Sequence, residues 1–187
     1  MKPILFSALS LLTLLPLTAN ASDNQEHVQH EAHVHGEATL HLILQGNDLE
    51  MELHSPAMNI LGFEHKAASA EEKQKVKDAI ATLENASELF SFSGTECHHA
   101  KAEAELDQEE HDDHEKHADH NVDHQSEHSE FDVDYAFRCD DGARLSAIVV
   151  KLSKRFSGIH KLDAEWIFNE NQGAAELTGN AFTIKVE

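Results

Sequence analysis

The chain has 187 residues, with 35 acidic against 14 basic side chains and a formal net charge of −21. A surface this acidic repels nucleic acid and anionic lipid, which argues against both as partners and favours cations. Acidity also keeps exported proteins soluble, so the charge alone does not establish metal binding.

The chain begins with the pattern of a cleavable signal peptide. Lys2 precedes an apolar run over residues 4–17, and Ala19-Asn20-Ala21 is a small-residue cleavage site. The run is shorter than the roughly 20 residues needed to span a bilayer, so we expect no membrane insertion of the mature chain. We predict cleavage after Ala21, removal of residues 1–21 and a periplasmic location.

Two strands joined by a tight turn are predicted next. Apolar and polar residues alternate from His33 to Leu44 and again from Asp48 to His54, as in half-buried strands. Gly46-Asn47 suits a two-residue hairpin turn. Closing this turn brings three apolar pairs onto one face: Leu44 with Leu49, Leu42 with Met51, and Leu40 with Leu53.

The polar face of the same hairpin predicts a metal site. The register sets His41 opposite Glu52, and residues two apart on a strand project the same way about 6.6 Å apart. His33 and His35 could therefore converge with His54 or a carboxylate on one ion, because zinc takes imidazole nitrogen and carboxylate oxygen in a tetrahedron. The alternative is a solvated sheet face that simply carries polar residues.

One helix is predicted after an irregular connection. The segment Ser69-Ala-Glu-Glu72 is a capping box, and apolar residues from Val76 to Ala86 recur at helical spacing. This amphipathic helix is expected to cover the sheet.

Cys97 and Cys139 flank a polar tract, and we predict that they form a disulfide. A metal–thiolate pair is the alternative, but exported thiols are usually oxidised. Cross-linking a loop of this size stabilises the fold by about 4 kcal/mol in the chain-entropy model.

Residues 101–130 lack an apolar pattern and are predicted to be a disordered, His-rich insertion in a single domain, residues 22–187. Within them, Glu109–His128 holds six histidines and eight carboxylates. Such a tract builds no core, so it is either a solvated charge run or a collector of metal ions. We expect zinc to cross-link its histidines and partly order it, and acid to release that zinc because protons compete for imidazole.

Further strands are predicted around residues 131–139, 145–152, 165–168 and 182–186 from their alternating apolar residues. With one main helix among about six strands, the predicted class is α+β with a largely antiparallel sheet.

The candidate metal ligands come from the hairpin face, the connection after it and the insertion. They are His33, His35, Glu37, His41, His54, His65, His111, His114, His117, His120, His124 and His128. The H-E-x-x-H signature of zinc proteases is absent, since Glu31 follows His30 but the next histidine is His33. We therefore predict a binding protein, not an enzyme, with a copper- or nickel-handling protein or a zinc-dependent hydrolase as alternatives.

Several segments together resemble the ZrgA-type periplasmic zinc-binding proteins. They are the H-x-H-G-x-A-x-L opening at His33, the stretch SPAMNILGFEH over residues 55–65, the His-rich insertion between two cysteines, Trp166, and GAAEL over residues 173–177. The resemblance implies zinc held by histidines, with the insertion as an accessory region. It also implies a role in zinc acquisition under limitation, beside an ABC-type uptake system.

Overall fold

The computed structural model describes residues 34–108, 128–179 and 181–186. The predicted signal peptide and most of the predicted insertion lie outside them. The elements in chain order are β1 (Glu37–Gln45), β2 (Asp48–Pro56), α1 (Ala57–Leu61), α2 (Ala70–Glu84), α3 (Ala86–Leu89), β3 (Phe90–Ser93), β4 (Cys97–Gln108), β5 (Ser129–Cys139), η1 (Gly142–Arg144), β6 (Ala147–Val150), α4 (Leu152–Arg155), β7 (Lys161–Phe168), β8 (Asn171–Thr178) and β9 (Phe182–Lys185).

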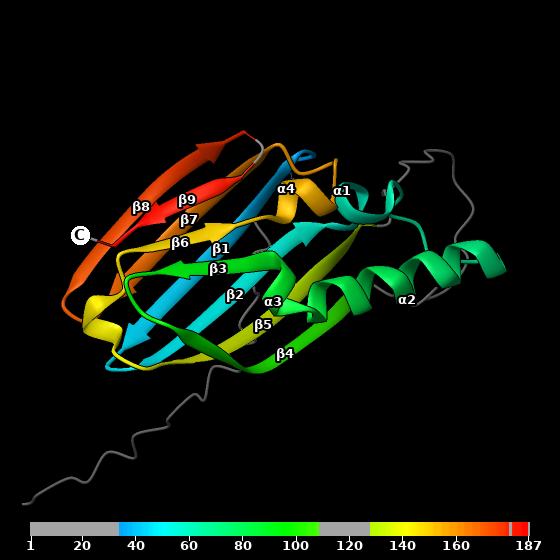
Figure 1. Ribbon diagram of the computed structural model, residues 1–187. Helices are drawn as coiled ribbons and strands as arrows, with labels where there is room; N and C mark the ends of the chain where they lie inside the picture. Colours follow the sequence, from blue (N-terminus) through cyan, green and yellow to red (C-terminus); the bar gives the residue numbers. More distant parts are fainter. Residues whose placement is uncertain (1–33, 109–127, 180, 187) are drawn as a thin grey trace, which may run out of the picture. The chain divides into compact units, whose positions relative to one another are not determined.

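The strands of the described ranges form two sheets (Figure 1). The larger has six strands in the order β4-β5-β2-β1-β7-β8, and the smaller has the order β3-β6-β9. In the larger sheet the β1–β7 pair is parallel and the other pairs are antiparallel. A mostly antiparallel β architecture with a few helices is thus confirmed. No helix in the described part of the chain is long and apolar enough to cross a membrane.

The β1–β2 hairpin has the predicted register. Leu40 pairs with Leu53, Leu42 with Met51 and Leu44 with Leu49, and all of them are buried. Gly46 in the turn has a φ of 63°, which glycine adopts without steric cost. Since the turn fixes this register, the alternate residues of both strands face solvent on the opposite side, called here the outer face.

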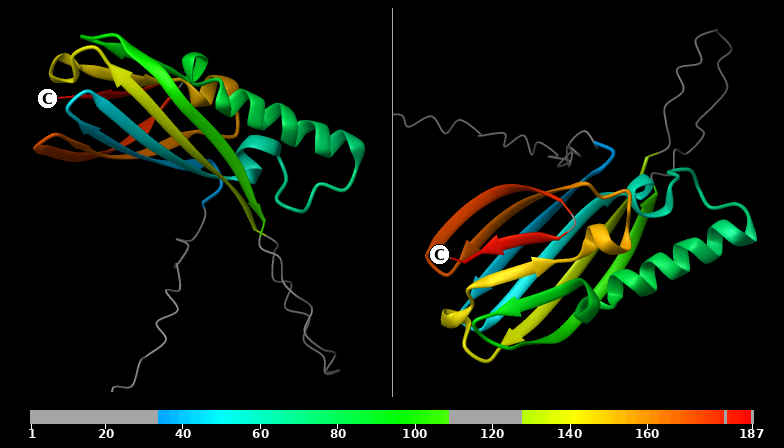
Figure 2. Two further views of the ribbon diagram at one scale, coloured as in Figure 1. Left: turned by 90° about the horizontal axis from the view of Figure 1, so that it is seen from below. Right: turned by 45° about the horizontal axis from the view of Figure 1, so that its top comes forward.

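The smaller sheet and α2 cover the inner face of the larger sheet, and the core lies between them (Figure 2). The ring of Phe90 on β3 packs edge-on against Tyr135 of β5 at 4.8 Å. The Tyr135 hydroxyl donates a hydrogen bond of 3.0 Å to the carbonyl of Leu83 in α2. Burying each leucine of such a core contributes about 1.5–3 kcal/mol, so the inner face holds these layers together.

Helix α2 begins with the predicted capping box. The Ser69 hydroxyl accepts a hydrogen bond from the Glu72 amide, and the Glu72 carboxylate accepts from the amides of Ser69 and Ala68. These backbone hydrogen bonds lower the pKa of Glu72. On the inward side of the helix, Ala79 and Leu83 are buried, as the helical spacing predicted.

The first strand is shorter than predicted. Strand β1 starts at Glu37, whereas the alternation suggested a start at His33. Gly36 has a φ of 93°, and the Glu37 amide donates to the carbonyl of Val34, so the chain turns here. The Asn59 side chain fixes this turn, since it accepts from the Gly36 amide at 2.6 Å and donates to the Glu37 carbonyl at 2.7 Å.

The Cys97–Cys139 disulfide is present, as predicted. It joins the beginning of β4 to the end of β5, and the two strands stay paired as far as Gln108 and Ser129. Residues 101–108 and 129–130, predicted to be disordered, are therefore strand residues. Their alternation was missed because β4 is an edge strand whose small and charged side chains bury little apolar surface.

Other elements also differ from the prediction. Strands β3 and β8 and the short helices α1, α3 and α4 were not predicted, and the strand expected over residues 145–152 is split between β6 and α4. Strand β8 lies at the other edge of the larger sheet, and Gly173 in it faces the Trp166 ring. An edge strand with glycine and alanine at its centre lacks the apolar alternation by which strands are recognised.

Candidate metal centre

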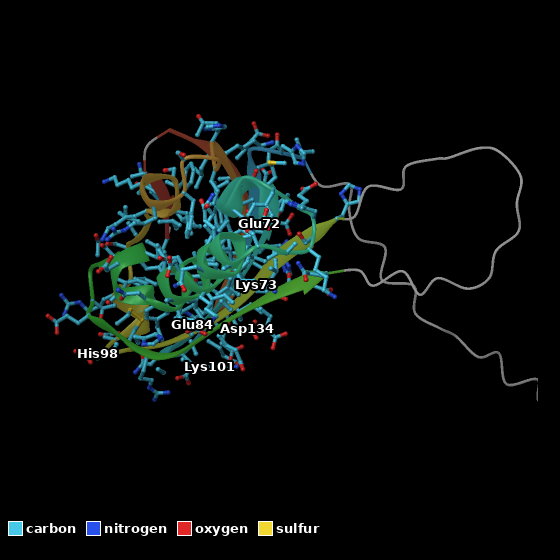
Figure 3. All side chains as sticks on the ribbon, turned by 90° about the vertical axis from the view of Figure 1, so that its right-hand side faces the viewer. Glu72, Lys73, Glu84, His98, Lys101 and Asp134 are labelled. Carbon is cyan, nitrogen blue, oxygen red and sulfur yellow. A yellow bond between two sulfur atoms is a disulfide. The ribbon has the colours of Figure 1, made fainter. Side chains whose placement is uncertain are left out.

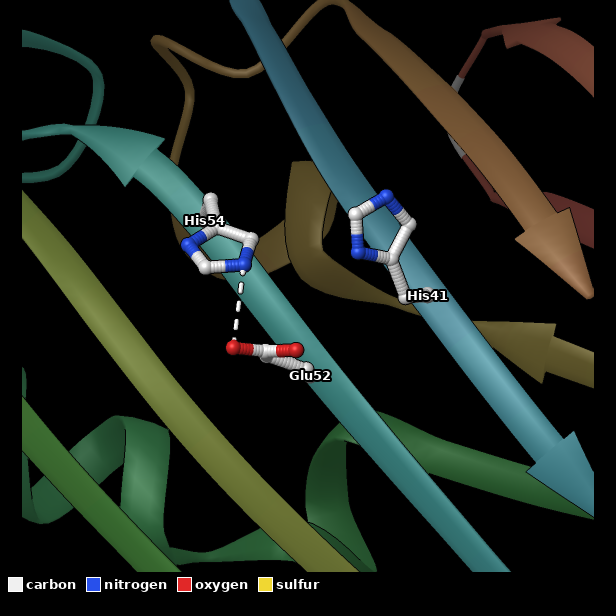
Figure 4. A group of neighbouring side chains, drawn as sticks. All are labelled: His41, Glu52 and His54. Atoms are coloured by element: carbon white, nitrogen blue, oxygen red, sulfur yellow. Dashed lines mark ion pairs between the residues drawn. The ribbon is translucent and has the colours of Figure 1, made fainter. Parts of the chain in front are cut away.

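Three potential ligands meet on the outer face of the β1–β2 hairpin. His41 lies on β1 opposite Glu52 on β2, and His54 follows two residues later on the same face (Figure 4). The rings of His41 and His54 lie edge-on with their centroids 5.8 Å apart, and Nε2 of His54 is 3.3 Å from Oε1 of Glu52. One ligand atom from each residue lies within 4.8 Å of the others, so small side-chain movements would close them around one ion.

A fourth side chain orients His54. Strand β5 pairs with β2 so that Asp132 lies opposite His54, and Oδ1 of Asp132 is 2.6 Å from Nδ1 of His54. A carboxylate only accepts, so Nδ1 carries the proton and donates it in this bond. Nε2 is then the nitrogen available to a metal on the side of Glu52. Histidines that bind metals almost always donate the other ring N–H to an acceptor, which can be a carboxylate, a backbone carbonyl or water.

The site is open to solvent. His41, Glu52 and His54 have exposed side-chain fractions of 45%, 53% and 30%. Three protein ligands leave one tetrahedral position for water or for an incoming group. Glu165 on β7 adds another carboxylate 3.9 Å from Nε2 of His41. The arrangement therefore suits a cation that enters and leaves from solvent.

A second group of side chains centres on Glu64, in the connection between α1 and α2. His35 places Nε2 at 2.9 Å from Oε1 of Glu64, and His128 places Nδ1 at 3.6 Å from Oε2. The Glu64 side chain is only 12% exposed, and the Ser129 hydroxyl donates to its backbone carbonyl at 2.6 Å. Two histidines far apart in the sequence thus share one nearly buried carboxylate.

The predicted ligands do not all come together. Of the two partners predicted for His35, a carboxylate or His54, the structure places a carboxylate, Glu64, beside it. His54 lies instead with His41, Glu52 and Asp132. Glu37 forms an ion pair with Lys161, and the hydrogen bonds that the Lys161 ammonium donates to Glu176 and Glu37 raise the pKa of that lysine. His65 lies 3.3 Å from Glu72. The other predicted ligands lie outside the described residues: His33, His111, His114, His117, His120 and His124.

The ligand prediction missed Asp132 and Glu64. Asp132 was expected on a strand and Glu64 in an irregular connection, but the histidines that they contact lie 78 and 29 positions away in the chain. Only the pairing of β5 with β2 brings Asp132 to His54. The alternation over residues 131–139 correctly placed Asp132 among the polar positions of its strand, and this was the one local signal.

Comparisons with known proteins agree with this metal-binding chemistry. The family model described as ZrgA family zinc uptake protein matches residues 32–186, which include both groups of side chains. No curated protein matches the chain. Because the match spans nearly the whole described structure, the chain belongs to the ZrgA family of zinc uptake proteins.

Proposed function

We propose that this protein binds zinc in the periplasm and buffers or delivers it for uptake when zinc is scarce. The observation that carries the proposal is the group formed by His41, Glu52 and His54, with Asp132 holding the His54 ring. Its nitrogen and oxygen donors are those that zinc takes in proteins. The disulfide supports the location, since such bonds persist in oxidising compartments.

The geometry favours transfer over permanent storage. A structural zinc site is closed by four protein ligands, whereas three ligands on an exposed sheet face leave a position that an acceptor can occupy. The net charge of −21 raises the local concentration of cations around the chain. The His-rich insertion would add lower-affinity capacity beside the ordered site, and an ABC-type uptake system is the proposed recipient.

We propose binding and not catalysis as the role of the site. A zinc hydrolase needs a water held against a positioned base in a shaped, water-excluding cavity. Here the ligands project from a sheet into solvent, and the nearby carboxylates lie within reach of the histidines. That arrangement supports cation exchange more directly than a fixed reacting geometry.

The test is a zinc competition titration with a chromophoric chelator on the mature, metal-stripped chain. His54→Ala should weaken the tightest site by about 100-fold or more, because it removes a ligand and leaves Asp132 without its donor. His99→Ala is the matched control, since it removes an exposed imidazole that faces Phe137 on another strand. An unchanged affinity in His54→Ala would contradict the proposal.

The metal itself is tested separately. Imidazole and carboxylate ligands also accept copper and nickel, and copper binds most such sites more tightly than zinc. The chain exported by its own cell and purified without added metal should contain zinc when its metal content is measured. Copper or nickel in place of zinc would favour the alternative of a copper- or nickel-handling protein.

A further inference from the structure

A third group of potential ligands lies beside the disulfide. Glu96 and His98 flank Cys97, and Asp140 follows Cys139. One ligand atom from each of these three residues lies within 4.8 Å of the others, and Nε2 of His98 is 3.3 Å from Oδ1 of Asp140. We propose that Glu96, His98 and Asp140 bind a divalent cation such as zinc at a second site that depends on the disulfide.

This site is separate from the one on the β1–β2 hairpin. Eight positions along β5 separate Asp140 from Asp132, which corresponds to roughly 26 Å of extended strand. His98 lies near the beginning of β4 (Figure 3). The two sites share no residue, so either can be lost without the other, and this proposal does not rest on the function proposed above.

The charges around this group favour a cation. Two carboxylates face one imidazole, and the neighbouring Asp141 adds a further negative charge. Arg138, which pairs with His98 across the strands, is already engaged by Asp48 in a hydrogen-bonded ion pair. Lys101 likewise donates a hydrogen bond to the Glu103 carboxylate, and this bond raises the pKa of Lys101. Arg138 and Lys101 are therefore paired with other carboxylates, and a bound metal ion would balance the negative charge of Glu96 and Asp140.

The disulfide sets the geometry of the three ligands. Strand β4 is an edge strand, and its pairing with β5 ends at Cys97 and Cys139. The Asp140 amide donates to the Glu96 carbonyl at 2.9 Å, so the backbone beyond the disulfide stays paired. Ends of edge strands open easily when few contacts hold them. The covalent link prevents this opening and keeps Asp140 facing Glu96 and His98.

The three donors suit zinc but bind it less tightly than a buried site would. All three residues are exposed, so water competes for the ion and completes its coordination. The ligand set of one imidazole nitrogen and two carboxylate oxygens lies within the range that zinc accepts. We therefore expect occupancy at zinc concentrations above those that fill the His41–Glu52–His54 site.

The experiment follows the histidine ring nitrogens of the ¹⁵N-labelled mature chain by NMR while zinc is added. The His98 ring nitrogens should shift with zinc, and the zinc concentration for half-saturation should rise by about tenfold or more in Asp140→Asn and in Glu96→Gln. His99→Ala is the matched control, because His98 and His99 are neighbours that project to opposite faces of β4. His99→Ala should leave the His98 response unchanged.

The dependence on the disulfide is tested with the double variant Cys97→Ser/Cys139→Ser. The His98 response should weaken by about tenfold or more, while His54 still responds at the concentration seen in the wild type. If the double variant does not fold, Asp140→Asn and Glu96→Gln decide the question. The proposal is overturned if the His98 ring does not respond to zinc, or if its response persists unchanged in Asp140→Asn. His54→Ala should abolish zinc binding at the His41–Glu52–His54 site and leave the His98 response unchanged. This result would distinguish failure of the proposed function from failure of the second site.

Discussion

Asp132 and His54 lie opposite each other on β5 and β2, with Oδ1 of the carboxylate 2.6 Å from Nδ1 of the ring. In the proposed zinc site Asp132 would act through His54, because its contact with Nδ1 holds the ring and leaves Nε2 on the side of Glu52. Such partners of metal-binding histidines are worth about 10- to 100-fold in affinity.

We therefore expect Asp132→Asn to weaken the tightest zinc site by about 10- to 100-fold, less than the loss in His54→Ala. The asparagine keeps the size of the side chain but removes the charge that favours the Nδ1–H form. The chelator competition titration measures the affinity, and ring-nitrogen NMR of His54 should show a changed mixture of the two neutral tautomers. Asp78→Asn is the control for the loss of one negative charge. Asp78 lies in helix α2, where its carboxylate accepts a hydrogen bond from Gln74. If both variants bind zinc equally well, Asp132 has no orienting role.

The His-rich insertion should increase the number of zinc ions that the chain binds, whereas the tightest site should lie on the β1–β2 hairpin. Because Gln108 and Ser129 are paired neighbours in the β4–β5 ladder, Asn-Gly in place of residues 109–128 would close a hairpin at this point. We expect this variant to bind fewer zinc ions by calorimetry while keeping at least one tight ion. Loss of all zinc binding in a folded variant would show that the ordered site depends on the insertion.

A second variant separates imidazole from charge in that tract. Replacing its six histidines with asparagine keeps the length and the eight carboxylates of Glu109–His128. We expect the number of bound zinc ions to fall as far as in the hairpin variant, because neutral imidazole is the better zinc ligand. Retained capacity would instead assign the binding to the carboxylates.

The hairpin, and with it the approach of His41 to Glu52 in the candidate site, was predictable from the sequence because it depends on local pattern. The turn at Gly46-Asn47 sets the register, and the register alone places His41 opposite Glu52. Asp132 could not be assigned to His54 in this way. Its position depends on the pairing of β5 with β2, whose paired residues His54 and Asp132 are more than 70 positions apart. The alternation of residues within each strand does not indicate which strand is its neighbour.

The same reasoning explains why the sequence could not identify Glu64 as the carboxylate partner of His35. Its alternation with Val34 and Gly36 continues the pattern of the strand, so the sequence favoured a common face with His54. The positive φ of Gly36 and the hydrogen bonds of Asn59 turn the chain just before β1, and His35 reaches Glu64. The hydrogen bonds of Asn59 in α1 therefore decide the direction of the chain at Gly36, although the residue alternation there is that of a strand.

The disulfide should contribute measurably to stability. Cys97 and Cys139 are separated by 42 positions, and closing a loop of this length stabilises the fold by about 4 kcal/mol in the chain-entropy model. We expect Cys97→Ser/Cys139→Ser to lower the free energy of unfolding in urea by an amount of this order. Thiol titration of the denatured, non-reduced wild type should find no free thiol. Two free thiols, or an unchanged unfolding midpoint in the variant, would contradict the prediction.

Tyr135 links the sheet to α2 and should make stability fall at alkaline pH. Its hydroxyl donates to the Leu83 carbonyl at 3.0 Å, and Tyr135→Phe should cost about 0.5–1.5 kcal/mol through the loss of that bond. Burial raises the pKa of Tyr135 in the folded chain, with the nearby Glu84 carboxylate acting in the same direction.

In the unfolded chain this phenol has its ordinary pKa of about 10. Above that pH the unfolded state has lost the proton and the folded state still holds it, so the free energy of unfolding falls as pH rises. Lys161, whose pKa is also raised, contributes in the same direction, so the informative quantity is the difference between wild type and Tyr135→Phe. Urea unfolding at about pH 8 and about pH 11 should show a smaller loss of stability in the variant.

Since Tyr135 is the one tyrosine in the sequence, phenolate absorbance of the folded wild type reports its ionisation directly. Appearance of that absorbance near pH 10 without unfolding would contradict the raised pKa.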